Sequence, residues 1–283
     1  MARSPPHWPG STDRSRPARR RYALRVRALF IAITVLLGSV AAAPQAELAL
    51  VRTVGLEANT HHVQGVDFGQ RRLWVTSVDK TGHKGYLQEF AVDTGALLRT
   101  VEVTRGVQYH AGGLSAEGGS LWLPVAEYRR ASSSAVEKRS VRTLELEAEF
   151  SVADHIGCVA VAPGEVVGAN WDSRDFYIWD RAGRLLRKAS NPTQNAYQDM
   201  KFVDGMLVAS GLLPDHSGAI DWLEYPSPRL VRRVAVGHTD RGVSYTSEGM
   251  AIHGDRILLL PEDSPSRLFE FRLGRAEASH RRQ

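Results

Sequence analysis

The stretch HHVQGVDF (61–68), followed by RRLWVTSVD (71–79), is the first copy of a pattern that recurs four more times along the chain. Each copy begins with a few polar residues, runs into a short apolar strand, and reaches a second strand through a tight turn. The five first strands are HHVQGVDF (61–68), YHAGGLSA (109–116), DHIGCVAV (154–161), YQDMKFV (197–203) and TSEGMAIH (246–253). Because His62, His110 and His155 are 48 and 45 residues apart, the copies keep a nearly constant stride, which is typical of a repeat architecture.

Every copy contains further strand-like segments separated by turns rich in Gly, Asp or Ser. Second strands are expected at 71–79, 119–127, 164–172, 205–215 and 255–263, and third strands at 85–92, 134–141, 175–180, 218–225 and 266–273. Turns running into fourth, edge strands are expected at 93–103, 142–152, 181–190 and 227–236. Short strands without any long helical period predict an all-β fold, and a repeated four-stranded unit of this length predicts a β-propeller.

The fifth copy ends near residue 273 and lacks a fourth strand. The segment ELALVRTVGL (47–56) resembles the fourth-strand segment ALLRTVEV (96–103), so we expect it to close the last blade. This gives five four-stranded blades in a single domain over 47–273, with four blades and a separate hairpin, or six blades of which one is degenerate, as the alternatives. Closure would remove the open sheet edges through which repeat proteins aggregate. The polar tail at 274–283 is expected to be disordered.

The first 42 residues read as a signal peptide rather than as part of the fold. A basic segment (14–27) precedes an apolar run (28–43) that ends in small residues. This order is typical of secretion signals, and the apolar run is shorter than the about 20 residues that a membrane-spanning helix needs. We therefore expect a secreted or periplasmic protein cleaved after Ala42, with an uncleaved N-terminal membrane anchor as the alternative.

The basic charge of the chain belongs to this leader. Residues 1–42 carry eight arginines and one aspartate, a net charge of +7, whereas the whole chain is +5, so the remainder is 5 − 7 = −2. The positive charge therefore gives no reason to expect nucleic-acid binding. The single cysteine, Cys158, excludes an intrachain disulfide and is interpreted as a small buried apolar residue. We expect a monomer whose partner is a small molecule.

The repeat brings three histidines and a glutamate to one place. In a propeller the first strand of each blade lines the central channel, so the starts of all five first strands meet at one mouth. His62, His110, His155 and Glu248 are therefore predicted as metal ligands and catalytic residues around one divalent ion, namely zinc, copper or iron. Such a set leaves a position open for water or substrate. The alternative is a hydrogen-bonded polar ring without a metal.

Other side chains at the same mouth are predicted to bind the substrate. Gln64 and Gln198 would orient it, Tyr109 would lie on the rim, and Trp171 with Asp172 would form one wall. Acids at the ends of the second strands are suitable partners for metal-bound histidines, although ion pairs with surface lysines and arginines, or turn capping, would explain them equally well. These acids are Asp79, Glu127, Asp172, Asp215 and Asp263.

The motifs together resemble a family of uncharacterised secreted bacterial and fungal proteins, a domain of unknown function. The resemblance rests on HHVQGVDF…LWVTSVD, YHAGGLS…LWLPVAEY, DHIGCVA…NWDSRDFYIWD and SEGMAI, and it covers about residues 48–273. More loosely, VDTGALLRTVEV (92–103) is similar to the blade-ending turn of YVTN, quinoprotein-like and gluconolactonase-like propellers. Gluconolactonase-like members carry a carboxylate-rich calcium site in the channel, whereas this chain has histidines there.

Two functions are consistent with these features. The first is an exported hydrolase or lyase that acts on a small polar molecule at the channel mouth, using a metal or histidine acid–base chemistry. The second is a non-catalytic propeller that holds a ligand or a protein partner on the same face. The fold alone does not separate them, because propellers serve both purposes.

Overall fold

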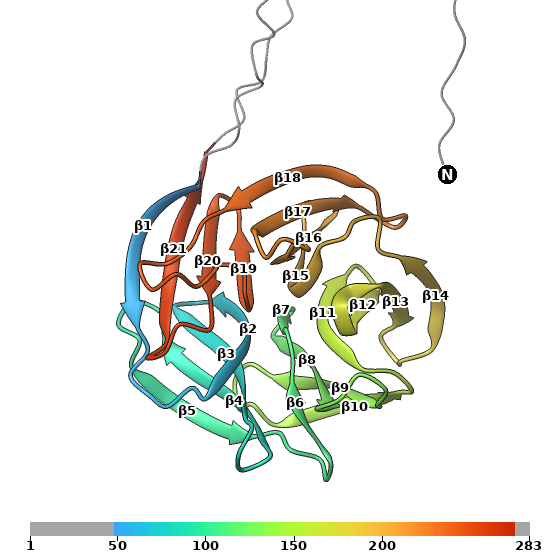
Figure 1. The fold of residues 1–283 in the computed structure, drawn as a ribbon. Helices are drawn as coiled ribbons and strands as arrows, with labels where there is room; N and C mark the ends of the chain where they lie inside the picture. The colour runs from blue at the N-terminus through green and yellow to red at the C-terminus, as the bar shows by residue number, and fades with distance from the viewer. Residues whose placement is uncertain (1–47, 275–283) are drawn as a thin grey trace, which may run out of the picture. The chain divides into compact units, whose positions relative to one another are not determined.

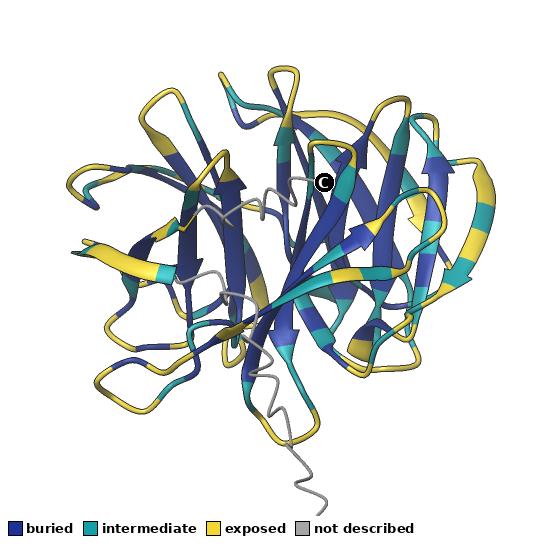
Figure 2. Cartoon of the chain, turned by 90° about the horizontal axis from the view of Figure 1, so that it is seen from above, coloured by how far each residue is buried: buried dark blue, intermediate teal, exposed yellow. Residues whose placement is uncertain are grey.

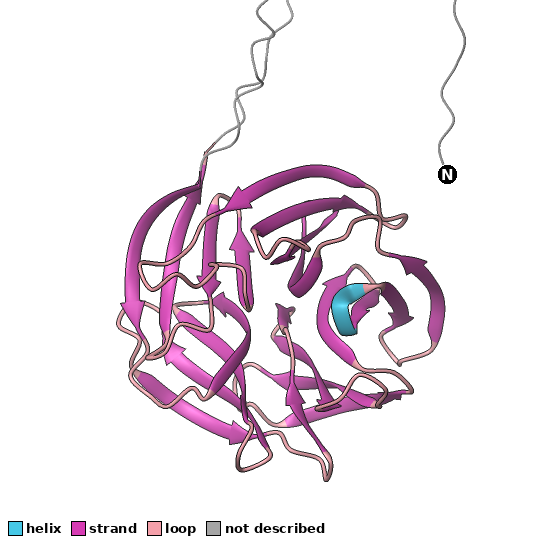
Figure 3. Cartoon of the chain, viewed as in Figure 1, coloured by secondary structure: helices cyan, strands magenta, loops and turns pink. Residues whose placement is uncertain are grey.

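The computed structural model describes residues 48–274 and is a five-bladed β-propeller (Figures 1 and 3). The expected signal peptide (1–42) and all but the first residue of the expected tail (274–283) lie outside the described residues. The first three blades are built from β2 (His62–Gly69), β3 (Arg72–Asp79), β4 (Lys84–Ala91) and β5 (Leu97–Glu102); from β6 (Gln108–Ala111), β7 (Ser115–Glu117), β8 (Ser120–Glu127), β9 (Ser134–Ser140) and β10 (Leu146–Val152); and from β11 (Ile156–Ala162), β12 (Glu165–Asn170), β13 (Asp175–Asp180) and β14 (Leu185–Ser190).

The fourth blade contains β15 (Ala196–Val203), β16 (Met206–Leu212), β17 (Gly218–Glu224) and β18 (Leu230–Val236). The fifth contains β19 (Gly249–His253), β20 (Arg256–Leu260) and β21 (Arg267–Leu273), and its outer strand is β1 (Leu48–Gly55), which pairs antiparallel with β21. The predicted five blades and the closure by the N-terminal strand are confirmed. In Figure 1 the blue β1 lies beside the red β21, at the seam where the ring closes.

The hydrophobic core lies between the blades. Five clusters of buried apolar side chains each join neighbouring blades, including one that packs the fifth blade against the first. Trp74 and Trp122, which stand at matching positions of β3 and β8, belong to two of these clusters. Cys158 is fully buried, and this burial raises the pKa of its thiol. Figure 2 shows the buried residues along the inner strands and the exposed ones on loops and outer strands.

The inner strands carry a repeated irregularity that their sequence alternation does not reveal. In β2, β6, β11 and β15 the pairing register shifts near the start of the strand, at Gln64–Gly65, Tyr109, Gly157 and Gln198 respectively. A bulge of this kind leaves a residue without a partner on the neighbouring strand. Its side chain then no longer follows the regular alternation between the two faces of the sheet. In the second blade the inner strand is also divided into β6 and β7, which both pair with β8.

Below the channel mouth the blades come into direct contact along the axis. Gly113 donates its backbone N–H to Gly157 O of the next blade, at 2.8 Å. A Cβ atom on Gly113 would lie 2.6 Å from the Cβ of Cys158, so only glycine permits this approach. Fully buried Asp199 accepts hydrogen bonds from Val66 N (3.0 Å) and Met250 N (3.1 Å), which ties three blades together. The axis is therefore closed beneath the mouth.

One predicted strand is shorter than expected. The second strand of the third blade ends at Asn170 instead of Asp172, and Trp171–Ser173 forms a 3-10 turn, cyan in Figure 3. Asp172 and Ser173 have φ values of 60° and 52°, which end the strand and turn the indole of Trp171 over the channel mouth. Across residues 48–274 no helix is long and apolar enough to cross a membrane.

Candidate functional site

A polar cavity of about 170 Å³ lies at the mouth of the channel, where the inner strands begin. Most of the side chains predicted from the repeat line it, and so do a few that were not predicted. The lining residues are His62, Gln64, His110, Tyr128, His155, Gly157, Asn170, Trp171, Asp172, Tyr197, Gln198 and Glu248. They come from all five blades, so this cavity exists only when the ring is closed.

The repeat places equivalent positions on this wall. Gln64, Gln198 and Glu248 occupy the same place in their blades, and the bulges at Gln64 and Gln198 direct these amides towards the axis. Tyr109, predicted on the rim, does not line the cavity. It is itself the bulged residue of β6, and its ring stacks on His83 and Tyr128 at centroid distances of 5.0 and 6.0 Å.

His155 and His110 form a hydrogen-bonded chain that starts at a backbone carbonyl oxygen. This carbonyl fixes which ring nitrogens carry protons. His155 Nδ1 lies 3.0 Å from the carbonyl oxygen of Arg129, and a carbonyl only accepts, so Nδ1 carries the proton. The Nε2 atom of His155 is then an acceptor, and it lies 3.1 Å from His110 Nδ1, which must donate. Consequently His110 Nε2 keeps its lone pair, while Trp171 and Tyr128 flank the pair with edge-on rings.

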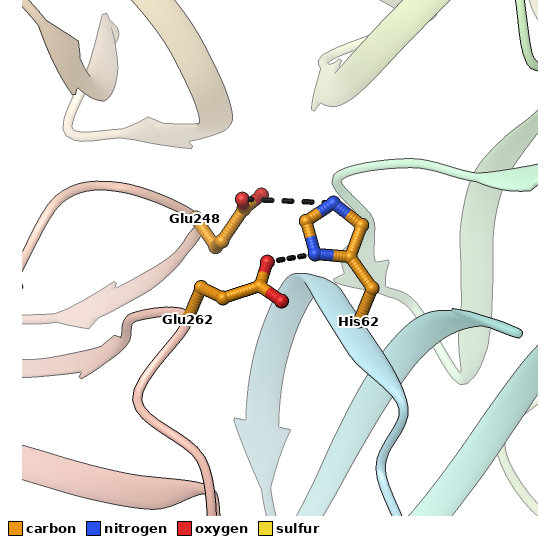
Figure 4. A group of neighbouring side chains, drawn as sticks. All are labelled: His62, Glu248 and Glu262. Carbon is orange, nitrogen blue, oxygen red and sulfur yellow. Dashed lines mark ion pairs between the residues drawn. The ribbon is translucent and has the colours of Figure 1, made fainter. Parts of the chain in front are cut away.

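The third histidine lies between two glutamates (Figure 4). Nδ1 of His62 is paired with the carboxylate of Glu262, and Nε2 faces Glu248 Oε1 across 3.9 Å. Gln64 Nε2 donates to the other oxygen of Glu248 at 3.1 Å. One ligand atom from each of His62, Glu248 and Glu262 lies within 4.8 Å of the others, so these three residues could hold a metal ion. His110 and His155 lie outside this close group.

Burial disfavours the charged forms of the three histidines and of Glu248. It lowers the pKa of His62 to about 4, and Lys80 adds to this effect. Burial also lowers the pKa of His110 well below its ordinary value and lowers that of His155, so all three imidazoles are neutral at pH 7. The same desolvation raises the pKa of Glu248 well above that of a free glutamate. The cavity thus holds neutral imidazoles and a carboxylic acid whose ionisation burial opposes.

The acids at the ends of the second strands serve the loops and not the histidines. Asp79 and Asp215 accept from backbone amides of their own turns, at 2.9–3.0 Å. Glu127, Asp172 and Asp263 pair with arginines. His61, exposed and outside the cavity, has φ +46° and stacks on Tyr86. Glu262 and Tyr128 were not predicted. Each is the sequence neighbour of a predicted strand-end acid, Asp263 and Glu127 respectively, and the loop directs Glu262 and Tyr128 towards the axis instead.

Comparison with known proteins places the chain in a family. A model described as "Family of unknown function (DUF6454)" matches residues 47–204. The chain belongs to this family of unknown function. The matched residues include the three histidines and Gln64, whereas Glu248 and Glu262 follow the matched stretch. No curated protein sequence matches the chain significantly.

Solved structures resemble the fold at low sequence identity. A glutaminyl cyclase from Myxococcus xanthus superposes with a TM-score of 0.61 at 15% identity, covering 81% of this chain and 97% of that one. The Pan2 WD40 domain of Neurospora crassa (TM-score 0.47, 11% identity, 76% and 62% covered) and BamB from Moraxella catarrhalis (0.41, 11%, 76% and 61%) are more distant. At 15% identity the likeness to the cyclase supports the propeller fold alone.

Proposed function

We propose that the axial cavity binds one divalent metal ion, namely zinc, copper or iron, and that the protein is a metal-dependent hydrolase or lyase acting on a small polar molecule. One observation carries this proposal. Glu248, 9% exposed, makes no ion pair with a lysine or arginine of the described chain and instead faces the lone pair of a neutral imidazole. A buried carboxylate is costly without a compensating charge, and a metal ion supplies it.

The geometry supports a particular set of ligands. An ion with bonds of about 2.0–2.2 Å spans ligand atoms up to about 4.2 Å apart, so one ion can bridge the 3.9 Å between His62 Nε2 and Glu248 Oε1. His110 lies outside the close group of His62, Glu248 and Glu262, but its Nε2 keeps a lone pair on the same cavity wall, so a movement of its ring towards the ion would add it as a ligand. With that movement, two histidines and one carboxylate would form a donor set that zinc hydrolases and non-haem iron enzymes share, with open positions for water and substrate.

Both of these histidines have the outer partner that metal-bound imidazoles need. Glu262 engages Nδ1 of His62, and His155 engages Nδ1 of His110. Such partners fix the ring orientation and leave Nε2 free for the metal. We therefore assign His155 the role of orienting His110, which differs from the expectation that all three histidines are ligands.

The low pKa values favour ligands over acid catalysts. A histidine that donates a proton to a substrate must be protonated near neutral pH, and burial prevents this for all three. The ion would supply Lewis acidity and acidify water. Gln198 and Asn170 offer amides for orienting the substrate, while Trp171 and Tyr128 limit the access of water. From the leader at 1–42 we further propose that this chemistry takes place outside the cytoplasm.

The test is turnover that depends on the metal. The protein is stripped with a chelator, reconstituted separately with Zn²⁺, Cu²⁺ or Fe²⁺, and assayed against small esters, lactones, amides and hydroxy acids. We expect hydrolysis or elimination only after reconstitution and its loss in Glu248→Gln, with Glu117→Gln on a remote surface as the control. Metal binding without turnover of any substrate would support the non-catalytic binding propeller instead.

A further inference from the structure

One lysine at the channel mouth has neither an ion-pair nor a hydrogen-bond partner among residues 48–274. Lys80 follows β3 in a turn that Asp79 holds by accepting from Thr81 N (3.0 Å) and Gly82 N (2.9 Å). Its ammonium group is exposed, lies 5.7 Å from the ring centroid of Tyr128 on the cavity wall, and forms neither an ion pair nor a hydrogen bond with any described residue.

The other basic side chains around this mouth are occupied. Arg129 and Arg130 pair with Glu127 and Asp172 at 2.7 and 2.6 Å. Arg174 donates to the backbone carbonyls of Asp172 and Asn195, and Arg241 pairs with Asp263 at 2.9 Å. Among these described basic side chains, Arg174 has no acid partner but is held by these carbonyls, whereas Lys80 has no polar partner at all. The field of Lys80 reaches the cavity, because it lowers the pKa values of His62, His110 and Glu248.

The charge balance of the cavity indicates which charge a ligand beside Lys80 would carry. With a divalent ion bound, the charges of Glu248 and Glu262 cancel those of the ion, and imidazole, which binds metals in its neutral form, contributes none. A neutral centre beside one unpaired ammonium group attracts a negative charge, and the low-dielectric wall formed by Tyr128 strengthens that attraction.

We propose that the ligand of this cavity is a small organic anion, such as a carboxylate, whose charge pairs with Lys80 while its reactive part lies against the metal-binding residues. Lys80 is therefore a residue that determines specificity. This inference rests on the proposed metal site, because the charge balance includes the ion.

The experiment compares acetate with acetamide, which has nearly the same shape but no charge. Binding to the metal-loaded protein is followed by calorimetry and by the change in tryptophan fluorescence, to which Trp171 on the cavity wall contributes, in wild type, Lys80→Gln and Lys80→Arg. We expect Lys80→Gln to weaken acetate binding about five- to tenfold, Lys80→Arg to restore most of it, and acetamide to respond to neither substitution. The acetate effect should shrink at high salt.

Lys138→Gln is the matched control, because Lys138 pairs with Glu147 on an outer strand. Metal content is measured in every sample, so that a failed metal site and a wrong ligand class are distinguishable. The inference is overturned if metal-loaded Lys80→Gln binds acetate as tightly as wild type, or if acetamide binds as well as acetate. A wild-type protein that takes up no metal would contradict the proposed function first.

Discussion

The blades and the axial cavity both bury carboxylates, but they treat them differently. Each of four blades places an acid on its third strand, nearly or fully buried, beside an arginine: Glu89 with Arg99, Glu137 with Arg139, Asp221 with Arg233 and Glu270 with Arg256. Glu248 is buried to a similar degree, yet its partners are the amide of Gln64 and a neutral histidine.

The difference shows where the chain supplies its own compensating charge. In the blades an arginine on the same or the adjacent strand is part of the repeat, so the ion pair is a component of the fold. At the channel mouth the repeat supplies neutral imidazoles and amides around Glu248. The buried acid there is left for a charge that comes from outside the chain, which is the central claim of the proposed function.

The largest expected effect is on the blade pairs. Removing Arg139 by substitution to Met leaves Glu137, 1% exposed, with only the more distant Arg105, whose Nη1 lies 3.5 Å from Oε1. Breaking a buried ion pair from one side costs about 3–5 kcal/mol, and because Arg105 remains we expect a loss of about 3 kcal/mol in the free energy of unfolding measured by urea denaturation. Arg184→Met, at an exposed pair with Asp180, is the control and should change little. Equal, small losses in both variants would contradict the structural role of the blade pairs.

The next effect is a dependence of stability on pH that arises in the cavity. The pKa of His62 is about 4 in the folded state and about 6.5 when unfolded, so the unfolded chain gains the proton first as pH falls. The contribution of neutral His62 to the free energy of unfolding is therefore fully present above pH 6.5. It decreases as pH falls towards 4, by about 1.4 kcal/mol per pH unit at most. In metal-free protein, His62→Asn should flatten this slope. An unchanged slope would show that His62 is not held neutral.

A smaller effect concerns the outer partner of His110. If His155 orients that ring for a metal, His155→Phe should keep the fold and weaken metal affinity about 10–100-fold, as measured by competition with a chromophoric chelator. Loss of all binding would make His155 a ligand, and no change would remove it from the site. His253→Phe, on a half-exposed ring outside the cavity, serves as the control.

The smallest effect is on the free energy of unfolding, which we expect to change in opposite directions when glutamate is replaced by glutamine at position 248 and at position 89. Burial raises the pKa of Glu248 well above its ordinary value of 4.5, so the unfolded chain loses this proton first as pH rises, and the metal-free protein is less stable at pH 7 than at pH 4 on account of this group. Glu248→Gln should therefore raise the free energy of unfolding by about 1 kcal/mol, whereas Glu89→Gln in a blade should lower it by about 1–3 kcal/mol. Losses in both variants would mean that Glu248 already has a compensating charge.

The repeat made the fold predictable, because short turns and four strands per copy recur visibly, and the segment 47–56 repeats an earlier fourth strand. Inward positions such as His62 and Glu248 followed from the same alignment. The bulges were not predictable, because the residues at a bulge are of the same types as those in a regular strand. For this reason the bulge at Tyr109 was not foreseen, and its ring lies outside the cavity lining. Glu262 escaped for a similar reason: which of two adjacent acids faces the axis depends on the loop after β20.

The most direct test of the central claim is the metal content of the purified protein. Wild type, Glu248→Gln and Glu89→Gln are equilibrated with Zn²⁺, desalted, and analysed for bound metal per chain. We expect about one ion in wild type and in Glu89→Gln, and none in Glu248→Gln, because Glu89 already pairs with Arg99, whereas Glu248 has no lysine or arginine partner among the described residues. A wild-type protein that retains no metal, or a Glu248→Gln variant that retains as much as wild type, would contradict it.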